Sequence, residues 1–215
     1  MASRDPGHQS RTASATTPRP WSGTKELSRK TWPDFEALFT RGGGWDHCAC
    51  MHFHRPHALP PSERLHTRAE RAVRNLRQKR DLVEAGRAHG ILVYVDGEAV
   101  GWCQYGPREE LPRFDNSRKY RGLVPPGGPK LWRITCFVVD KRYRRRGIAG
   151  AALRAALQAI KSRGGGLVEA YPVARWRAGT FGNVSTHGTK SMFAKQGFKV
   201  VAPWGNTNVL MRRRI

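Results

Sequence analysis

Two stretches in the N-terminal half of the chain carry apolar residues at helical spacing. The first begins at Thr31 in TWPDFEALF and ends at the glycines 42–44. The second begins at Thr67, where TRAE has the Thr-x-x-Glu spacing of a capping box, and ends at Gly86. Its predicted apolar stripe consists of Ala69, Ala72, Val73, Leu76 and Val83. Because the Arg and Lys residues of this helix fall mostly on its other faces, we predict that they face solvent.

Runs of β-forming residues predict the rest of the architecture. GILVYVDGEAVGWCQYG contains two such runs on either side of Asp96-Gly97, the dipeptide that a two-residue hairpin turn favours. In chain order, the later predicted elements are a strand at 131–139, a helix after Gly147, a strand at 167–173, a short helix near 187–196 and a hairpin from 198 to 213. This order of helices and strands predicts an α/β (α+β) fold with a central mixed sheet and helices on its faces.

The length of 215 residues suits one well-buried domain. The first twenty residues hold Ser, Thr, Pro and Arg without an apolar block, which argues against a secretory signal. We predict a disordered basic tail over 1–24 and a folded domain over 25–215, although an organellar transit peptide has a similar composition. No apolar run is long enough for a membrane span, and the four cysteines do not make a disulfide framework for this size. We therefore expect a cytoplasmic protein with no membrane partner, as a monomer or homodimer.

The formal net charge of +23 changes the set of partners to consider. A field of this sign attracts polyanions, so nucleic acid is a partner that the composition leaves open, together with phosphorylated cofactors. The same field disfavours polycationic substrates unless an acidic pocket reverses it locally.

The strongest charge cluster lies in DKRYRRRGIAGAALRAAL, from residue 140 to 157. Five cations, Lys141, Arg142, Arg144, Arg145 and Arg146, run into Gly147 and the start of a helix. A helix N-terminus offers unpaired N–H groups to phosphate, and a glycine lets the ligand approach the backbone. The body of this helix is Ala and Leu, so it belongs in a core and lacks the basic face of a groove-reading helix. The pattern favours one compact anion over a long polyanion.

These residues resemble a known family. The strand CFVV followed by Arg144-x-x-Gly147-x-Ala149 and an apolar helix is similar to the acetyl-CoA signature of the GNAT acyltransferases, Gln/Arg-x-x-Gly-x-Gly/Ala. GWCQYG, WRITCFVVDKRYRRRGIA, GGGLVEAYP and GTKSMFAKQGF follow in the order of that family, over roughly residues 30 to 213. CACMHFH and GWCQ are also similar to segments of a bacterial subgroup of it.

The resemblance implies a single GNAT-type domain whose mostly antiparallel sheet splays at the acetyl-CoA strand. Acetyl-CoA would be the co-substrate, and no metal is expected. The main chain of 137–139 would pair with the pantetheine arm, and N–H groups from Arg144 through Gly150 would hold the pyrophosphate. The cofactor-binding residues so implied are Phe137, Val138, Val139, Arg144, Arg145, Arg146, Gly147, Ile148, Ala149 and Gly150. A primary amine would then attack the acetyl carbonyl directly.

The catalytic groups depart from the family pattern. Arg133 stands where histone-acetylating members carry a glutamate, and Phe193 stands where many members carry a tyrosine acid. We therefore predict that Glu169 is the base and that Tyr171, two residues on and on the same strand face, orients the acceptor or acts as acid. His187 is a weaker candidate for the base.

The acceptor side is expected to involve Trp45, Cys48, Cys50, Trp102 and Gln104. WDHCACMHFHRPH also holds His47, His52, His54 and His57, so zinc is an alternative for this segment. Cys-x-Cys is not the usual zinc spacing, and we interpret the segment as a substrate-facing loop or a packed turn. Trp102 has an equally plausible place in the core.

The function predicted from the sequence is N-acetylation of a primary amine on a small molecule. An aminoglycoside acceptor would require an acidic pocket built from Glu109, Glu110, Asp115 and Glu169. Two alternatives stay open: an acyltransferase acting on an RNA-bound substrate, and a catalytically silent module that binds CoA or nucleic acid.

Overall fold

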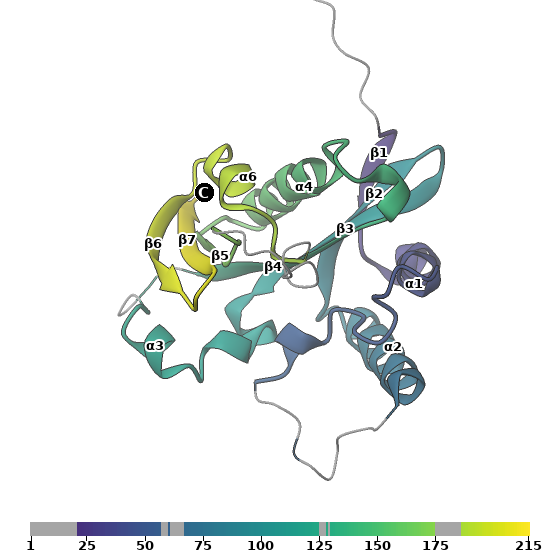
Figure 1. The fold of residues 1–215 in the computed structure, drawn as a ribbon, viewed down its shortest axis with the longest axis horizontal. Coiled ribbons are helices and arrows are strands. Elements are labelled where there is room, and N and C mark those ends of the chain that lie inside the picture. Colours follow the sequence, from purple (N-terminus) through teal and green to yellow (C-terminus); the bar gives the residue numbers. More distant parts are fainter. Residues whose placement is uncertain (1–20, 57–59, 61–66, 125–127, 129, 175–185) are drawn as a thin grey trace, which may run out of the picture.

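The computed structural model describes residues 21–56, 60, 67–124, 128, 130–174 and 186–215. They form a seven-stranded sheet with the strand order β1-β2-β3-β4-β5-β7-β6 (Figure 1). The strands are β1 (Gly23–Glu26), β2 (His89–Val95), β3 (Glu98–Pro107), β4 (Leu131–Val139), β5 (Leu167–Ala170), β6 (Lys199–Trp204) and β7 (Asn208–Arg214). β4 and β5 run parallel, and the other neighbouring strands run antiparallel. The predicted fold class, one domain around a mixed and mostly antiparallel sheet, is confirmed.

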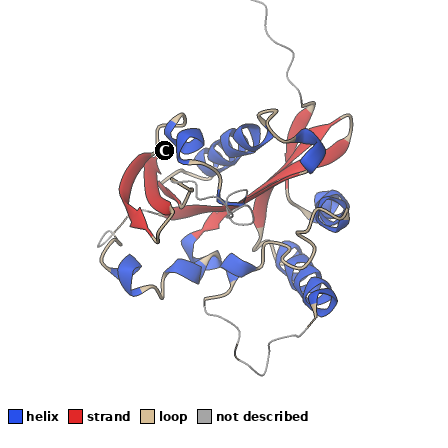
Figure 2. Ribbon diagram, viewed as in Figure 1, coloured by secondary structure: helices blue, strands red, loops and turns tan. Residues whose placement is uncertain are grey.

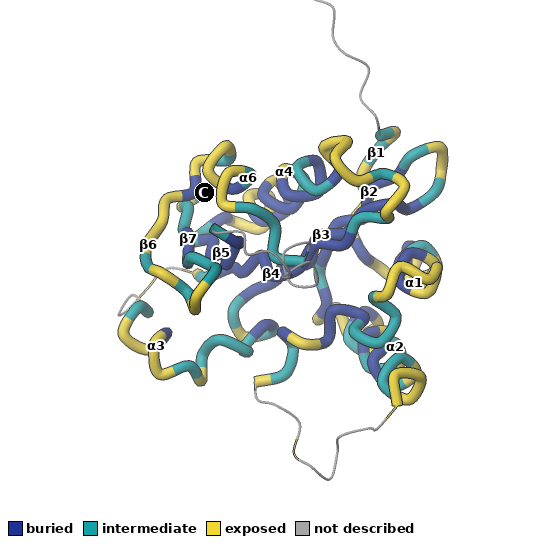
Figure 3. Tube along the Cα trace, viewed as in Figure 1, coloured by how far each residue is buried: buried dark blue, intermediate teal, exposed yellow. Residues whose placement is uncertain are grey.

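Helices cover both faces of this sheet (Figure 2). The α-helices are α1 (Trp32–Thr40), α2 (Arg68–Glu84), α3 (Arg118–Arg121), α4 (Ile148–Ser162) and α6 (Lys190–Ala194). Short 3-10 turns are η1 (Arg29–Thr31), η2 (His52–His54), η4 (Arg108–Glu110), η5 (Pro112–Phe114) and η6 (Lys141–Tyr143). One hydrophobic core lies between α4 and the sheet, and a second lies between α1 and the opposite sheet face. The central strands β2, β3, β4 and β5 are therefore the buried middle layer, whereas β6 is largely exposed (Figure 3).

α4 forms as the sequence predicts. Its buried side chains are Ile148, Ala151, Ala152, Leu153, Ala156, Leu157, Ala159 and Ile160. The many alanines allow the helix to lie close to the sheet, where a Cβ added at Gly101 would come within 2.3 Å of the Ile148 side chain. This close packing fixes the N-terminus of α4 against β3, next to the end of β4.

The start of the domain differs from the predicted boundary at residue 25. β1 begins at Gly23, where it pairs with Tyr94 of β2, so 23 and 24 belong to the sheet and not to the tail. Trp21 packs against the core beneath α4. Four residues give too little periodicity to be recognised as a strand, and their partner β2 lies more than sixty residues away. Residues 1–20 of the predicted tail lie outside the described residues.

The predicted apolar stripe of α2 is wrong in part, although its capping box is confirmed by reciprocal Thr67 and Glu70 hydrogen bonds. Val73 is 71% exposed, and the helix buries Asn75, Lys79 and Val83. The buried face is polar because it packs on a polar turn: the Asn75 amide donates to the His47 carbonyl at 2.7 Å. Lys79 therefore contradicts the prediction that the cations of α2 face solvent.

Candidate active site

The sheet opens between β4 and β5. Their register runs from Leu131↔Leu167 to Ile134↔Ala170 and then ends, while β4 stays paired with β3 as far as Val139↔Gly101. The β3–β4 register shifts after Gln104, which leaves Thr135 as an extra residue of β4 at the point of separation. The segment from Thr135 to Val139 therefore has no strand partner on its β5 side among the described strands. The splay that the resemblance implied is present.

A cleft of about 480 Å³ lies at the end of β4, against the N-terminus of α4. Its lining includes predicted cofactor residues: Val139, Arg144, Arg145, Gly147, Ile148, Ala149 and Gly150. Gly147 is the N-cap with a φ of 78°, a left-handed conformation that suits glycine, and no side chain caps the helix. The first N–H groups of α4 lack intrahelical acceptors. They can therefore donate to an anion in the cleft.

The loop before Gly147 supplies charge to this cleft. Arg145 also has a positive φ of 63°, so the chain turns sharply twice within three residues.

Three of the predicted cofactor residues do not line the cleft. Phe137 is buried against Phe193, Val138 faces the cavity described next, and the Arg146 guanidinium lies over the Tyr143 ring at 5.6 Å. Their predicted main-chain contacts stay predictions.

A second, smaller cavity of about 230 Å³ lies on the other side of the β4 end. It is lined by Phe39, Trp45, His47, Cys48, Cys50, His52, Phe53, Cys136, Val138, Thr186 and His187. Trp45 lines both the cleft and the cavity, so the two hollows adjoin at this ring. The structure thus brings together Trp45, Cys48 and Cys50, which the sequence assigned to the acceptor side.

His187 lies on the wall of this cavity. Its Nδ1 is 3.1 Å from the carbonyl oxygen of Thr135, at the extra residue of β4. A carbonyl accepts hydrogen bonds only, so Nδ1 carries the proton and Nε2 keeps its lone pair. Burial lowers the pKa of His187, while the Thr135 carbonyl opposes the shift. The imidazole is therefore neutral near pH 7 and can accept a proton at Nε2.

Trp102 and Gln104 do not line the cavity, contrary to the prediction. Trp102 is fully buried and packs edge-on against Phe35, and Gly90 leaves room for its ring on the neighbouring strand. Gln104 is also fully buried. Its amide donates to the Cys50 carbonyl at 2.9 Å and accepts from the Thr135 hydroxyl at 2.9 Å. Gln104 therefore ties the Cys50 turn to β4 and supports the cavity wall from behind.

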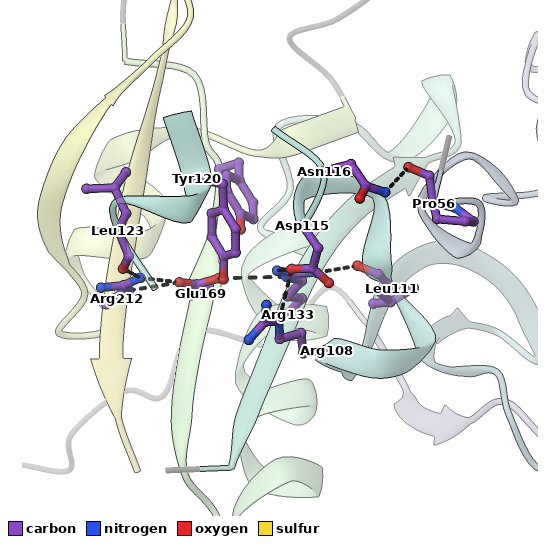
Figure 4. A network of polar contacts seen from close by, with 11 residues as sticks. Pro56, Arg108, Leu111, Asp115, Asn116, Tyr120, Leu123, Arg133, Glu169 and Arg212 are labelled. Carbon is purple, nitrogen blue, oxygen red and sulfur yellow. Dashed lines mark hydrogen bonds and ion pairs between the residues drawn. The ribbon is translucent and has the colours of Figure 1, made fainter. Parts of the chain in front are cut away.

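Glu169 lies in a buried polar network at the splay (Figure 4). Its carboxylate accepts hydrogen bonds from Tyr120 at 2.7 Å, from Tyr171 at 2.9 Å and from two Arg212 nitrogens at 2.8 and 2.6 Å. Burial raises the pKa of Tyr171, and the Glu169 carboxylate adds to this effect. The two predicted catalytic residues are thus in contact with each other, but neither lines the cleft or the 230 Å³ cavity.

Arg133 extends the network. It is fully buried and donates to Asp115 at 2.6 Å and to the Leu111 carbonyl at 2.6 Å (Figure 4). Asp115 also accepts from Arg108 at 2.9 Å. These partners come from the segment 107–124, for which the sequence patterns predicted no element. The signal that could have found them is the density of charged residues in PREELPRFDNSRKY, seven of fourteen.

Other lining residues also escaped the sequence reasoning. Trp21, Tyr143, Arg154 and Met192 line the cleft, and Phe39 and Cys136 line the cavity. They come from elements far apart in the chain, so no local pattern groups them.

For the zinc alternative, the part of the chain that the structure describes contains no group of three or more metal-ligating side chains, while His57 lies outside it. Within the same residues, no helix is long and apolar enough to cross a membrane.

Comparisons with known proteins agree with this geometry. Residues 31–175 match the model of the acetyltransferase (GNAT) family. The GNAT family N-acetyltransferase YhbS from Escherichia coli, solved in complex with CoA, aligns with a TM-score of 0.50 at 15% identity over 93% of this chain and 84% of that chain. A GNAT family protein from Desulfovibrio desulfuricans aligns with a TM-score of 0.50 at 13% identity over 89% of this chain and 98% of that one. At these identities the alignments show a shared fold. No curated protein sequence matches the chain.

Proposed function

Because the chain belongs to the GNAT family of acetyltransferases, we propose that it transfers the acetyl group of acetyl-CoA to a primary amine of a small molecule in the 230 Å³ cavity. The acyltransferase class follows from the family. The proposed acceptor site rests on one observation: the cavity lies beside the edge of β4 that has no partner among the described strands.

Acetyl-CoA fits the larger cleft. Its pyrophosphate suits the uncapped N-terminus of α4, where Arg144 and Arg145 add positive charge. The unpaired edge of β4 leads from this cleft toward Thr135 and offers main-chain groups to the pantetheine arm. YhbS, whose fold is shared, was solved with CoA, which supports the same ligand class here.

The lining of the cavity favours a compact and largely apolar amine. Three aromatic side chains, Phe39, Trp45 and Phe53, line the cavity, and none of its described lining residues carries a carboxylate. None of the four acidic residues that an aminoglycoside would need lines this cavity. Glu169 pairs with Arg212, and Asp115 pairs with Arg133. A polycation would therefore enter this site without a counter-charge.

His187 is the base that this arrangement supports. Its Nε2 removes the proton from the acceptor amine, and the Thr135 carbonyl, which accepts from Nδ1, stabilises the imidazolium that forms. A free main-chain N–H of β4 beyond Thr135 donates to the acetyl oxygen as negative charge develops. Glu169, the base predicted from the sequence, remains the alternative, and we assign it a positioning role with Tyr171 through the buried network.

The test is a panel of amines with purified protein and acetyl-CoA, read as CoA release and product mass. Aromatic monoamines such as phenethylamine and tyramine should be acetylated with at least tenfold higher kcat/KM than spermidine or kanamycin. A preference for the polycations, or acetylation of protein N-termini alone, would contradict the proposed acceptor. The substitution Phe53→Ala should reduce the preference for aromatic amines, while Phe198→Ala, in the core on the opposite face of the sheet, serves as its matched control.

The alternative of an RNA-bound substrate rests on the charge of +23. A filter-binding assay with tRNA at two salt concentrations distinguishes it from the small-molecule acceptor. Affinity that falls steeply with salt, together with acetylation of aminoacyl-tRNA, would favour the RNA-bound substrate.

A further inference from the structure

Two cysteines meet on the wall of the acceptor cavity. The Sγ atoms of Cys50 and Cys136 lie 3.0 Å apart, and the two residues come from different elements, the turn before η2 and β4. Both side chains are buried in the protein, yet both line the 230 Å³ cavity. The turn places Ala49 and Cys50 in left-handed conformations, with φ of 42° and 50°. Packing and the Gln104 hydrogen bond hold it in this conformation.

A buried lysine lies beside this thiol pair. Lys79 is fully buried, and its Nζ donates to Nε2 of His54 at 2.9 Å. His54 bonds the Glu110 carbonyl through Nδ1, so its protonated nitrogen is Nδ1 and its Nε2 is an acceptor. Burial lowers the pKa of His54 to about 2, and the nearby Lys79 charge adds to this, so the ring is neutral. Within the described part of the chain, no carboxylate forms an ion pair with Lys79.

An unpaired ammonium in the interior is costly, so a nearby anion would stabilise it. The ionisable groups around it are Cys48 and Cys50 of the turn, Cys136 of β4 and Glu110 of η4, and Cys103 of β3 lies near Cys50. Burial lowers the pKa of Lys79 to about 8, and the charges on Cys50, Cys136, Cys48 and Glu110 oppose that shift.

Among these thiols, Cys50 has the surroundings of a thiolate. Burial would raise its pKa, but the hydrogen bond with the Cys136 side chain, the Lys79 charge and the Trp102 side chain outweigh that effect and lower it. The hydrogen bond with Cys50 and burial both raise the pKa of Cys136. Burial also raises the pKa values of Cys48 and Cys103. Of these four thiols, Cys50 is therefore the one whose deprotonation the surroundings favour.

We propose that Cys50 and Cys136 form an oxidisable dithiol whose reacting thiolate is Cys50, whose counter-ion is Lys79 and whose oxidant is hydrogen peroxide. The cavity admits molecules of the size of water, and hydrogen peroxide is only slightly larger. The Cys50 thiolate attacks one peroxide oxygen, so the O–O bond breaks and hydroxide leaves, taking a proton to become water. Cys136 then attacks the sulfenic sulfur, its proton leaves with the hydroxyl as a second water, and the S–S bond forms.

This disulfide would change the acceptor cavity and leave the cofactor cleft intact. It would tie the turn that carries Trp45, Cys48 and Cys50 to the acetyl-CoA strand. Neither cysteine lines the 480 Å³ cleft. We therefore expect the oxidised protein to bind acetyl-CoA as before and to lose acetyl transfer, an effect that rests on the proposed function.

The chemical test does not depend on the acceptor. The reduced full-length chain is treated with hydrogen peroxide and mapped by peptide mass spectrometry without reduction. A Cys50–Cys136 disulfide that dithiothreitol reverses is the expected product. Cys48→Ser and Cys103→Ser should form it as the unmodified chain does. In Cys136→Ser, dimedone should label Cys50, whereas Cys136 should stay unlabelled in Cys50→Ser. Oxidation at Cys48 instead, or no reaction at Cys50, would overturn the proposal.

The role of Lys79 has its own readout. Lys79→Met should slow iodoacetamide alkylation of Cys50 at pH 7 about tenfold, the thiolate loss that one unit of pKa produces. If this variant does not fold, the pH profile of alkylation in the unmodified chain decides. If the alkylation rate has its inflection below the ordinary thiol pKa range, the Cys50–Lys79 ion pair is supported. An inflection within or above that range overturns the ion pair. Calorimetry measures acetyl-CoA binding, and CoA release measures acetyl transfer, in both the reduced and the disulfide form. Unchanged transfer in the disulfide form would refute the effect on the cavity. Absence of transfer in the reduced form would refute the proposed function and would leave the dithiol itself unaffected.

Discussion

Arg133 and Glu169 lie opposite each other in the last part of the β4–β5 pair, with the arginine Nε 3.7 Å from Oε2 of the glutamate. Both are fully buried, and the next residue pair, Ile134 and Ala170, is the last before the strands separate. Asp115 from the segment 107–124 and Arg212 from β7 complete the charge balance, and the Tyr120 hydroxyl donates to Glu169. A charged network of this kind holds the splay in place because removing any one member leaves the others buried and unpaired.

We predict that Glu169→Gln destabilises the protein by about 3 kcal/mol, the lower end for breaking a buried ion pair. For a chain of this size that corresponds to a fall in Tm of about 6–12 °C. Thermal unfolding followed by circular dichroism checks it. Glu84→Gln is the control, because Glu84 forms an exposed i,i+4 pair with Arg80 and should cost at most about 0.5 kcal/mol. A Glu169→Gln protein as stable as the unmodified chain but inactive would instead assign the base role to Glu169.

The contribution of His187 can be read from the pH profile of kcat. A base must be unprotonated, and the pKa of His187 is lowered by burial, so activity should fall only as pH drops below the ordinary histidine range near 6.5. His187→Gln should lower kcat by about 10²- to 10⁴-fold and remove this acidic limb. The dependence of kcat on deprotonation of the acceptor amine itself should persist in this variant. Retention of the acidic limb in His187→Gln would show that another group is the base.

Arg144→Ala should weaken acetyl-CoA binding about 10- to 100-fold, the value of one or two charge-assisted hydrogen bonds. Arg146→Ala is a matched control, because it removes the same charge from the same loop, but Arg146 lies over Tyr143 and does not line the cleft. Isothermal titration calorimetry measures both. Equal losses in the two variants would mean that the general field of the loop, and not the cleft contact, provides the affinity.

Gly90→Ala should destabilise the protein by about 1–3 kcal/mol through overpacking. A Cβ at this position would lie 1.9 Å from the Trp102 ring, which is fully buried and cannot move aside. Gly23→Ala adds the same methyl group to β1, where nothing lies within 4 Å, and should be nearly neutral. Urea unfolding of both proteins gives the comparison. A neutral Gly90→Ala would indicate that Trp102 has freedom to repack, and would restore it as an acceptor-facing residue.

Local patterns predicted the elements well where the signal was confined to one segment. Asp96 and Gly97 both have positive φ, 48° and 81°, as the hairpin turn requires, and the capping box at Thr67 forms as expected. The pattern failed where a partner from elsewhere decided the outcome. Lys79 is buried because a polar turn from residues 47–54 lies against α2, and Val73 is exposed for the same reason.

The candidate site divides in the same way. The cationic loop, Gly147 and the start of α4 are consecutive in the chain, so their anion-binding geometry is a local property that the sequence determined by itself. The order of elements predicted a mixed sheet with helices on its faces, and the resemblance to the GNAT family implied the splay. Only the tertiary structure decided which acids and bases are free, because burial and cross-chain partners set their chemistry. It engaged Glu169 with two arginines, bonded Nδ1 of His187 to the Thr135 carbonyl at the cavity, and brought the Sγ of Cys50 within 3.0 Å of that of Cys136 across 86 positions of sequence.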